Sequence, residues 1–195
     1  MFQVMGPLRH PHKSILAALF CALWISAPHG LAAQDNGTVL DELFTQLAEA
    51  DSAQAGERVA RAIVDRWSRS GSAAIDLLLQ RGLQALSQRN PQAAVEHMTA
   101  LIDHAPDVAQ AYQLRATAYY QLGYRGPAIA DLGTALDLEP RHFIAMSGLA
   151  VLLQDMGDLE AALEVYRAVL AIHPTDPDIG RAVGALEQAL RGEIL

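Results

Sequence analysis

Hydrophobic residues in the second half of this chain recur every three to four positions, in paired runs that repeat every 34 residues. Three segments of equal length align in this register without a gap: 75–108, 109–142 and 143–176. Each segment contains two runs with the spacing of an amphipathic helix. A repeat of this period is typical of stacked supersecondary units. The pattern therefore predicts three helix hairpins in succession.

Small side chains recur where the two helices of each predicted hairpin would cross. Alanine or glycine holds the eighth place of every segment and alanine holds the twentieth, at Gly82, Ala94, Ala116, Ala128, Ala150 and Ala162. Antiparallel helices approach closely only where a side chain is nearly absent, so we expect Ala116 to pack against Ala128. Proline holds the thirty-second place, at Pro106, Pro140 and Pro174, and should stop each second helix.

Other residues mark the predicted helix ends. Gly123 can adopt the left-handed conformation that ends a helix. Asn90 precedes Pro91, a favourable start, and Asp158 is a good N-cap. Asp176 should likewise cap a last helix, whose apolar stripe is Ile179, Val183, Leu186 and Leu190. We expect this helix, residues 177–192, to cover the end of the third repeat.

At these places the chain resembles the tetratricopeptide-repeat (TPR) family, and it is similar to secreted or periplasmic members of Gram-negative bacteria. The matching residues are Tyr112, Ala116, Tyr119, Gly123, Ala128, Leu132, Ala135 and Pro140, then Leu149, Ala150, Gly157, Ala162, Tyr166 and Pro174. The first repeat departs at its turn, where Arg89 replaces the usual glycine. The resemblance implies an all-α, right-handed α-α superhelix, or solenoid, that binds other proteins.

Residues 38–74 carry two further amphipathic runs ahead of the first repeat. Thr38 and Asp41 resemble a capping-box start. We interpret this stretch as an N-terminal helical pair, either a degenerate repeat or a cap. Three leucines on the first helix of the first repeat should then pack against the pair: Leu79, Leu83 and Leu86.

Residues 1–33 have the three-part pattern of a secretory signal peptide. Arg9 and Lys13 precede an apolar run of 14 residues, 14–27, and small residues follow it. That run is shorter than the roughly 20 residues of a membrane-spanning helix. We expect cleavage after Ala32 or Ala33 and a periplasmic product. The alternative is an uncleaved segment that anchors the chain in the inner membrane.

Loss of residues 1–33 would leave 12 basic against 22 acidic residues, a balance of −10, and no cysteine. This acidic balance argues against nucleic-acid binding. The four histidines after residue 33 form no zinc-type motif and are expected at the surface: His97, His104, His142 and His173. No nucleophile elbow, phosphate loop or dinucleotide motif occurs. We therefore expect no enzyme activity, cofactor, metal or small-molecule substrate.

Two groups of arginines have a structural and a functional interpretation. Arg81 and Arg115 hold the seventh place of consecutive repeats, and Arg115 could pair with Asp131 or bind an acidic partner. The equivalent of Asp131 for Arg81 is His97, so the role of Arg81 stays open. The stretch 57–69 holds a second group, Arg58, Arg61 and Arg69, beside acidic residues. It is either a solvated face with internal ion pairs or a docking patch.

In the TPR family, first-helix side chains at fixed places line a concave binding face. Here those places hold polar and apolar residues: Gln110, Gln113, Thr117, Tyr120, Gln121, Ser147, Val151 and Gln154. Co-chaperone members grip a peptide carboxylate with lysine, arginine and asparagine, and none of these occurs at the equivalent places here. We expect the face to bind an extended peptide or a partner helix, with Tyr120 as anchor. Self-association of the solenoid is the alternative.

Overall fold

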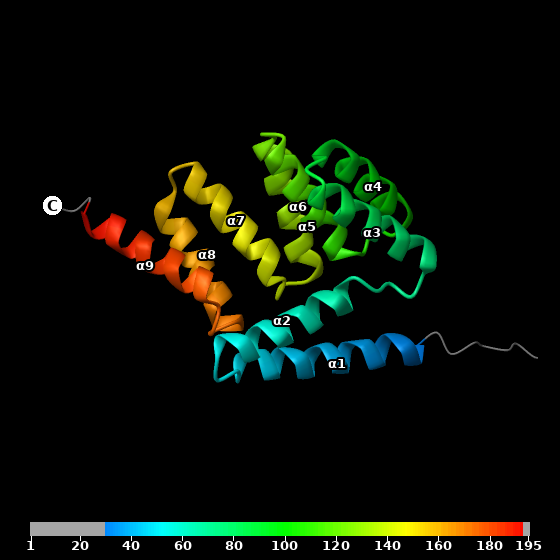
Figure 1. The fold of residues 1–195 in the computed structure, drawn as a ribbon, viewed down its shortest axis with the longest axis horizontal. Helices are drawn as coiled ribbons and strands as arrows, with labels where there is room; N and C mark the ends of the chain where they lie inside the picture. Colours follow the sequence, from blue (N-terminus) through cyan, green and yellow to red (C-terminus); the bar gives the residue numbers. More distant parts are fainter. Residues whose placement is uncertain (1–29, 193–195) are drawn as a thin grey trace, which may run out of the picture.

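The computed structural model describes residues 30–192, and for residues 30–36 it describes the backbone alone. This part of the chain is entirely helical (Figure 1). Its helices are α1 (Gly30–Ala48), α2 (Ala53–Trp67), α3 (Ala73–Ser87), α4 (Pro91–His104), α5 (Ala109–Gln121), α6 (Arg125–Leu138), α7 (Phe143–Asp155), α8 (Leu159–Ile172) and α9 (Pro177–Gly192). Helices α3 to α8 form the three predicted hairpins, so the all-α solenoid is confirmed.

Close contacts between the paired helices depend on small residues at the predicted places. Ala116 of α5 and Ala128 of α6 are fully buried members of one apolar cluster. In the first repeat, a Cβ atom at Gly82 would lie 2.3 Å from the Met98 side chain of α4. Glycine therefore leaves room for the Met98 side chain in its present position between α3 and α4.

The turns inside the repeats share one backbone geometry. Gly123 and Gly157 have φ of +79° and +84°, and Arg89 adopts the same left-handed region at +56°. In each turn, the next amide donates to a carbonyl five residues back, as in the bond from Asn90 N to Ala85 O. Arg89 thus departs from the family's glycine without changing the turn. It adopts a conformation that a side chain disfavours.

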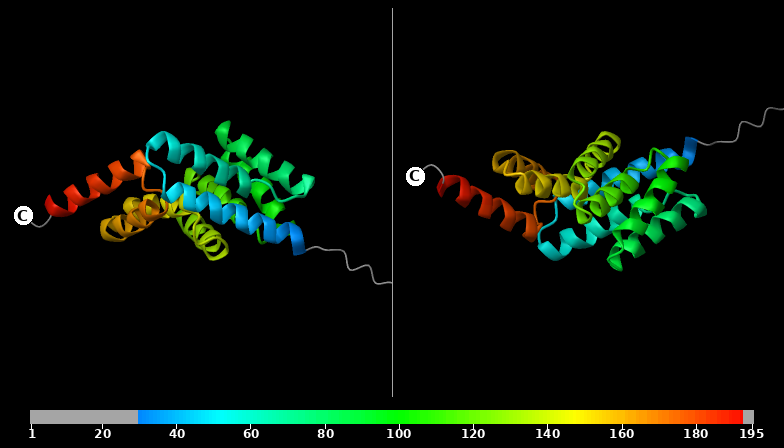
Figure 2. Two further views of the ribbon diagram at one scale, coloured as in Figure 1. Left: turned by 90° about the horizontal axis from the view of Figure 1, so that it is seen from below. Right: turned by 90° about the horizontal axis from the view of Figure 1, so that it is seen from above.

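Helix starts follow the predicted caps. The carboxylate of Asp158 accepts a hydrogen bond from Ala161 N, and the side-chain oxygen of Asn90 accepts one from Ala93 N. Asp176 caps α9 by accepting from the amide of Ile179 at 3.1 Å. Leu186 of α9 is buried against the third repeat, so α9 covers the end of the solenoid as expected. It projects from one end of the molecule (Figure 2).

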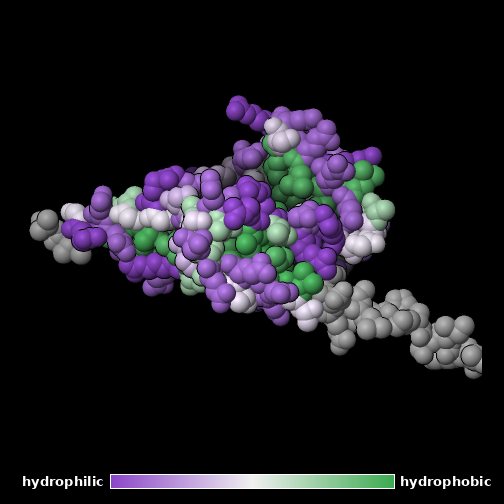
Figure 3. Space-filling model, turned by 60° about the horizontal axis from the view of Figure 1, so that its bottom comes forward, coloured by the Kyte–Doolittle hydropathy of each residue, from purple (hydrophilic) through white to green (hydrophobic). Residues whose placement is uncertain are grey.

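Helices α1 and α2 form an antiparallel hairpin that packs far from the start of the solenoid. In Figure 1 it lies across one side of the repeats and reaches the junction of α8 and α9. Phe44, Leu47 and Ile63 share an apolar cluster with Phe143 of α7 and Val169 of α8. The pair therefore packs on the third repeat and does not stack ahead of the first. The surface of the molecule on the side of the hairpin is mostly hydrophilic, and hydrophobic patches lie among the hydrophilic residues (Figure 3).

Two details of the N-terminal region differ from expectation. Helix α1 passes through Thr38, so the capping-box start was wrong. Leu79 and Leu86 pack inside the repeats, against α4 and its neighbours, and not against the hairpin. The reason is that α1 and α2 pack against α7 and α8, so Leu79 and Leu86 contact residues of the repeats instead.

The signal-peptide prediction lies largely outside the described residues. The predicted cleavage after Ala32 or Ala33 falls in the first turn of α1, within Gly30–Ala48. Between residues 30 and 192, no helix has both the length and the apolar character needed to cross a bilayer.

Candidate protein-binding surface

Helix α2 crosses the concave face and divides it into a covered and an open part. A cavity of about 610 Å³ lies between α2 and the repeats. Ala60 and Val64 of α2 line one side of it, and two concave residues, Leu83 of α3 and Ile144 of α7, line the other. Ile144 also packs against the apolar cluster of the hairpin. Leu83 and the first turn of α7 therefore belong to the covered part.

Two predicted binding residues, Gln110 and Gln113 of α5, are buried, with exposed fractions of 3% and 6%. The Gln110 amide donates to the Gln113 side-chain oxygen at 3.1 Å, and the Gln113 amide donates to Thr117 Oγ1 at 3.0 Å. The Ser147 hydroxyl donates to the Phe143 carbonyl at 2.8 Å. Neither glutamine is therefore open to a partner in this structure.

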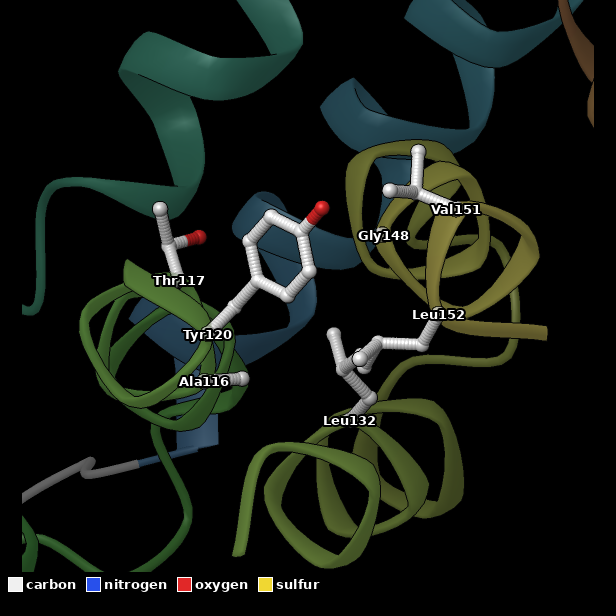
Figure 4. Close-up of a pocket in the computed structure, with 7 residues that line it drawn as sticks. All are labelled: Ala116, Thr117, Tyr120, Leu132, Gly148, Val151 and Leu152. Atoms are coloured by element: carbon white, nitrogen blue, oxygen red, sulfur yellow. The ribbon is translucent and has the colours of Figure 1, made fainter. Parts of the chain in front are cut away.

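The open part contains a pocket of about 180 Å³ between α5, α6 and α7 (Figure 4). Three predicted residues, Thr117, Tyr120 and Val151, are brought together in its wall. The other lining residues, which the sequence did not single out for binding, are Ala116, Leu132, Gly148 and Leu152. In Figure 4 the Tyr120 ring stands between α5 and α7, with Leu132 and Leu152 at the other end.

The remaining predicted residues, Gln121 and Gln154, are exposed at the ends of α5 and α7 and do not line the pocket. Their role in binding stays a prediction.

Tyr120 is held in place by a hydrogen bond between repeats. Its hydroxyl donates to Asp155 Oδ2 of α7 at 2.7 Å, and this bond raises the pKa of the tyrosine above its usual value. The ring is still 38% exposed. The hydroxyl of Tyr120 is therefore bonded to Asp155, and the aromatic ring is the part of the residue that stays available for contact.

No charged residue lines the pocket. Arg115, which precedes the lining residue Ala116, is bound to other side chains of the repeats. Arg115 of α5 forms two parallel bonds with the Asp131 carboxylate of α6, at 2.7 and 2.8 Å. Its third nitrogen donates to Thr99 of α4. The structural interpretation of Arg115 is confirmed. Arg81 lies beside a separate surface pocket with His97, and its role stays a prediction.

Two of the arginines in the stretch 57–69 pair with acidic residues four positions earlier in the chain. Arg61 pairs with Glu57 at 2.9 Å and Arg69 with Asp65 at 2.6 Å, and all four side chains are exposed. Arg58 is exposed as well. Exposed pairs of this kind contribute at most about 1 kcal/mol. Arg61 and Arg69 thus form the expected solvated face, while a docking role for the patch stays a prediction.

Two histidines expected at the surface are buried beneath the hairpin instead. His142 has an exposed fraction of 0% and stacks on Trp67 of α2, with ring centroids 4.2 Å apart. Its Nδ1 accepts from Ala145 N, and burial lowers its pKa from 6.5 to about 4. His173 is 3% exposed and faces Gly56 of α2. The surface prediction was wrong because it ignored the fold-back of α2.

A position-by-position comparison of the repeats could have indicated one of these roles. His142 holds the last place of its repeat, where Asp176 of the next repeat caps α9. A side-chain acceptor at this place caps the helix that follows, and a neutral imidazole supplies one. Over residues 37–192, whose side chains are described, no three histidine, cysteine or acidic side chains gather as metal ligands would.

Comparison with protein families agrees with this geometry. Models for the tetratricopeptide repeat match residues 79–124, 109–142 and 127–190. A TPR repeat-containing protein of Rhizobium etli is 33% identical over 153 residues, covering 78% of this chain and 75% of that protein. The bacteriophage adsorption protein A of Escherichia coli is 33% identical over 149 residues, which are 74% of this chain but 15% of that protein.

Solved structures share the fold at lower identity. The first TPR domain of Spaghetti (RPAP3), bound to an HSP90 peptide, has a TM-score of 0.58 at 24% identity, covering 62% of this chain and 95% of that domain. The TPR2B domain of yeast Sti1, in complex with an Hsp70 peptide, has a TM-score of 0.56 at 22% identity, covering 60% of this chain and 99% of that domain.

Proposed function

The chain belongs to the tetratricopeptide-repeat family, and from this premise we propose that it is a non-catalytic adaptor or scaffold of the bacterial cell envelope. It binds a segment of another protein on the open part of its concave face. The pocket walled by Thr117, Tyr120 and Val151 receives one apolar side chain of that segment. Gln121 and Gln154, which are exposed beyond the pocket, supply amide groups to the backbone of the ligand.

The observation that carries this proposal is the pocket itself. It is a hollow of about 180 Å³ with a mostly apolar wall, on the face that the repeat register assigns to ligands. Burial of one aliphatic or aromatic side chain there contributes about 1.5–3 kcal/mol. Tyr120 is already fixed by Asp155, so little of its side-chain freedom remains to be lost on binding.

The wall of the pocket also restricts the chemistry of the ligand. Similar TPR domains were solved with HSP90 and Hsp70 peptides. Neither lysine nor arginine lines the pocket here, and Arg115 is bound to Asp131. A free carboxylate would find no cation in this pocket. We therefore favour an internal segment with an apolar anchor, either extended or helical, over a chain end.

The envelope location rests on the pattern of residues 1–33. Cleavage should give a periplasmic protein whose measured mass corresponds to a start at residue 33 or 34. Intact mass spectrometry of the protein in a periplasmic fraction checks this. A soluble cytosolic chain that retains Met1 would contradict both export and anchoring, and a membrane-bound chain with Met1 would favour the anchor.

Affinity capture from an envelope extract tests the binding function. Gly148→Leu should fill the pocket, because a Cβ atom there already reaches within 3.4 Å of Leu132. The matched control is Gly133→Leu, since Gly133 is exposed on α6 with nothing within 4 Å. A protein captured by the unmodified chain and by Gly133→Leu, but lost with Gly148→Leu, supports the pocket. Retention by Gly148→Leu, with loss on charge reversal of Arg58 and Arg61, would move the site to α2.

A further inference from the structure

The contact between the α1–α2 hairpin and the repeats carries unpaired buried polar atoms. Among the described side chains, those atoms without a hydrogen-bond partner include Trp67 Nε1 of α2 and His142 Nε2, whose rings stack on each other. His173 Nε2 and Thr175 Oγ1 are also unpaired, and both face Gly56 of α2. No protein group replaces the hydrogen bonds that water gives these atoms in an open form, so they contribute little to the stability of the closed contact.

Two concave residues opposite α2 are incompletely packed. The cavity of about 610 Å³ lies between α2 and the side chains of Leu83 and Ile144. Release of α2 would hydrate the unpaired atoms of the contact, and it would leave Leu83 and Ile144 open to a ligand.

The contact is nevertheless built to fit one position of the hairpin. A Cβ atom at Gly56 would lie 2.2 Å from Thr175 Oγ1 and 2.7 Å from His173 Nε2, so only glycine allows α2 to approach this loop. At the other end, Arg141 pairs with Asp41 of α1 at 2.7 Å and lies 4.1 Å from the centre of the Phe44 ring. These features define one specific position of the hairpin on the repeats.

We propose that the α1–α2 hairpin is an intramolecular occupant of the concave face, which an amphipathic helical segment of the partner displaces. This inference rests on the proposed function, because it concerns the same face. In the closed form the partner reaches only the pocket of Tyr120. In the open form Leu83 and Ile144 join the site, and the ligand extends along the groove to reach them.

Tethering makes the hairpin an effective competitor. A segment joined by a short linker has an effective concentration on the order of millimolar. The linker here is residues 68–72, in which Gly71 is exposed with φ of +83°. The affinity of an external ligand is reduced in proportion to the closed fraction. A substitution that opens the hairpin should therefore raise affinity without touching the groove.

The first test uses Trp67 fluorescence in the full chain with Trp24→Phe, which leaves Trp67 as the only tryptophan. Gly56→Leu should shift the Trp67 emission to longer wavelength, because the indole leaves His142, while the helical circular dichroism stays within a few per cent. The control Gly37→Leu changes an exposed position of α1 with nothing within 4 Å and should leave the emission unchanged. An unshifted emission in Gly56→Leu would overturn the proposal.

The second test measures binding of a fluorescently labelled synthetic peptide of residues 37–69 to the surface that the hairpin occupies. It should bind the Gly56→Leu chain at least tenfold more tightly than the unmodified chain. Equal affinity for the two chains, or binding to neither, would overturn the proposal.

A third measurement needs no substitution and covers the case in which Gly56→Leu fails to fold. Hydrogen exchange of the unmodified chain should show amides of α2 exchanging at least tenfold faster than buried amides of α8. Equal protection of both helices would contradict an opening hairpin. None of these three readouts involves the captured partner, so their failure would leave the Tyr120 pocket standing. Failure of the Gly148→Leu capture would, in turn, leave the hairpin result standing.

Discussion

Arg115 and Asp131 join the two helices of the middle repeat through a nearly buried ion pair, with side-chain exposures of 16% and 10%. The bond to Asp131 raises the pKa of Arg115 further, so the guanidinium stays charged. Removal of the carboxylate alone would leave that charge with Thr99 as its remaining hydrogen-bond partner. Both residues therefore serve the fold, and substitution of either should act on stability before it acts on binding.

We predict that Asp131→Asn lowers the free energy of unfolding by about 3 kcal/mol, the scale of a broken buried pair. The matched control is Asp65→Asn, which breaks the exposed pair with Arg69 and should cost less than about 0.5 kcal/mol. Urea denaturation followed by circular dichroism measures both. Similar small losses in the two variants would show that Arg115 does not need its partner.

His142 makes stability depend on pH. Its pKa is about 4 in the folded chain, because burial disfavours the charged ring, and 6.5 is its ordinary value. The unfolded chain therefore takes up a proton first as the pH falls. The contribution is fully present above about pH 6.5 and is lost between about pH 6.5 and 4, amounting to about 3 kcal/mol.

We predict that His142→Asn removes this part of the pH dependence. Asparagine still caps α7 but cannot titrate, so any packing loss is constant with pH. Unfolding free energies at pH 7.5 and 4.5 should differ less in the variant than in the unmodified chain, by roughly 2–3 kcal/mol. An identical pH difference in both proteins would contradict a buried neutral imidazole.

At the scale of the elements, Arg89 in the first repeat differs from its equivalents, Gly123 and Gly157, in the same turn. Its φ of +56° is unfavourable for a side chain, whereas glycine adopts it freely. We predict that Arg89→Gly stabilises the chain by about 0.5–1 kcal/mol. This net gain is the backbone strain that glycine relieves minus the cost of the greater conformational entropy of the unfolded chain. Gly123→Ala should change stability in the opposite direction by a similar amount. The denaturant midpoints of the two variants and the unmodified chain measure these changes. A lower midpoint for Arg89→Gly would show that the backbone at Arg89 is not strained.

The repeats could be predicted from the sequence because each helix pairs with its neighbour along the chain. A small residue such as Ala116 and a cap such as Asp158 act within one hairpin, so spacing alone fixes their roles. The position of α1 and α2 could not be predicted. The apolar stripe that contains Phe44 and Leu47 shows that this face is buried, but not that α7 and α8 bury it.

The same distinction explains the outcome for the candidate site. Thr117, Tyr120 and Val151 share a face through the repeat register, and the structure brings them together in one pocket. Gln110 and Gln113 share that register, but both are buried, and their amide groups bond to other side chains of α5. Nothing local to the two glutamines signals that they are buried.

At the scale of the whole molecule, the chain combines a closed solenoid end with a partly open binding face. Helix α9 covers the last repeat, and the hairpin packs on α7 and α8. The pocket around Tyr120 remains open. Both covering parts belong to the chain itself, and the proposed control of partner binding concerns the hairpin alone.

The affinity of the captured partner for Tyr120→Ala tests the binding function most directly. We predict a loss of about 1–3 kcal/mol, because the ring forms one wall of the pocket. Tyr120→Phe keeps the ring and should bind almost as well as the unmodified chain, and Tyr124→Ala removes an exposed tyrosine outside the pocket and should have no effect. Unchanged affinity of Tyr120→Ala, with unchanged helicity, would contradict a partner site between α5 and α7.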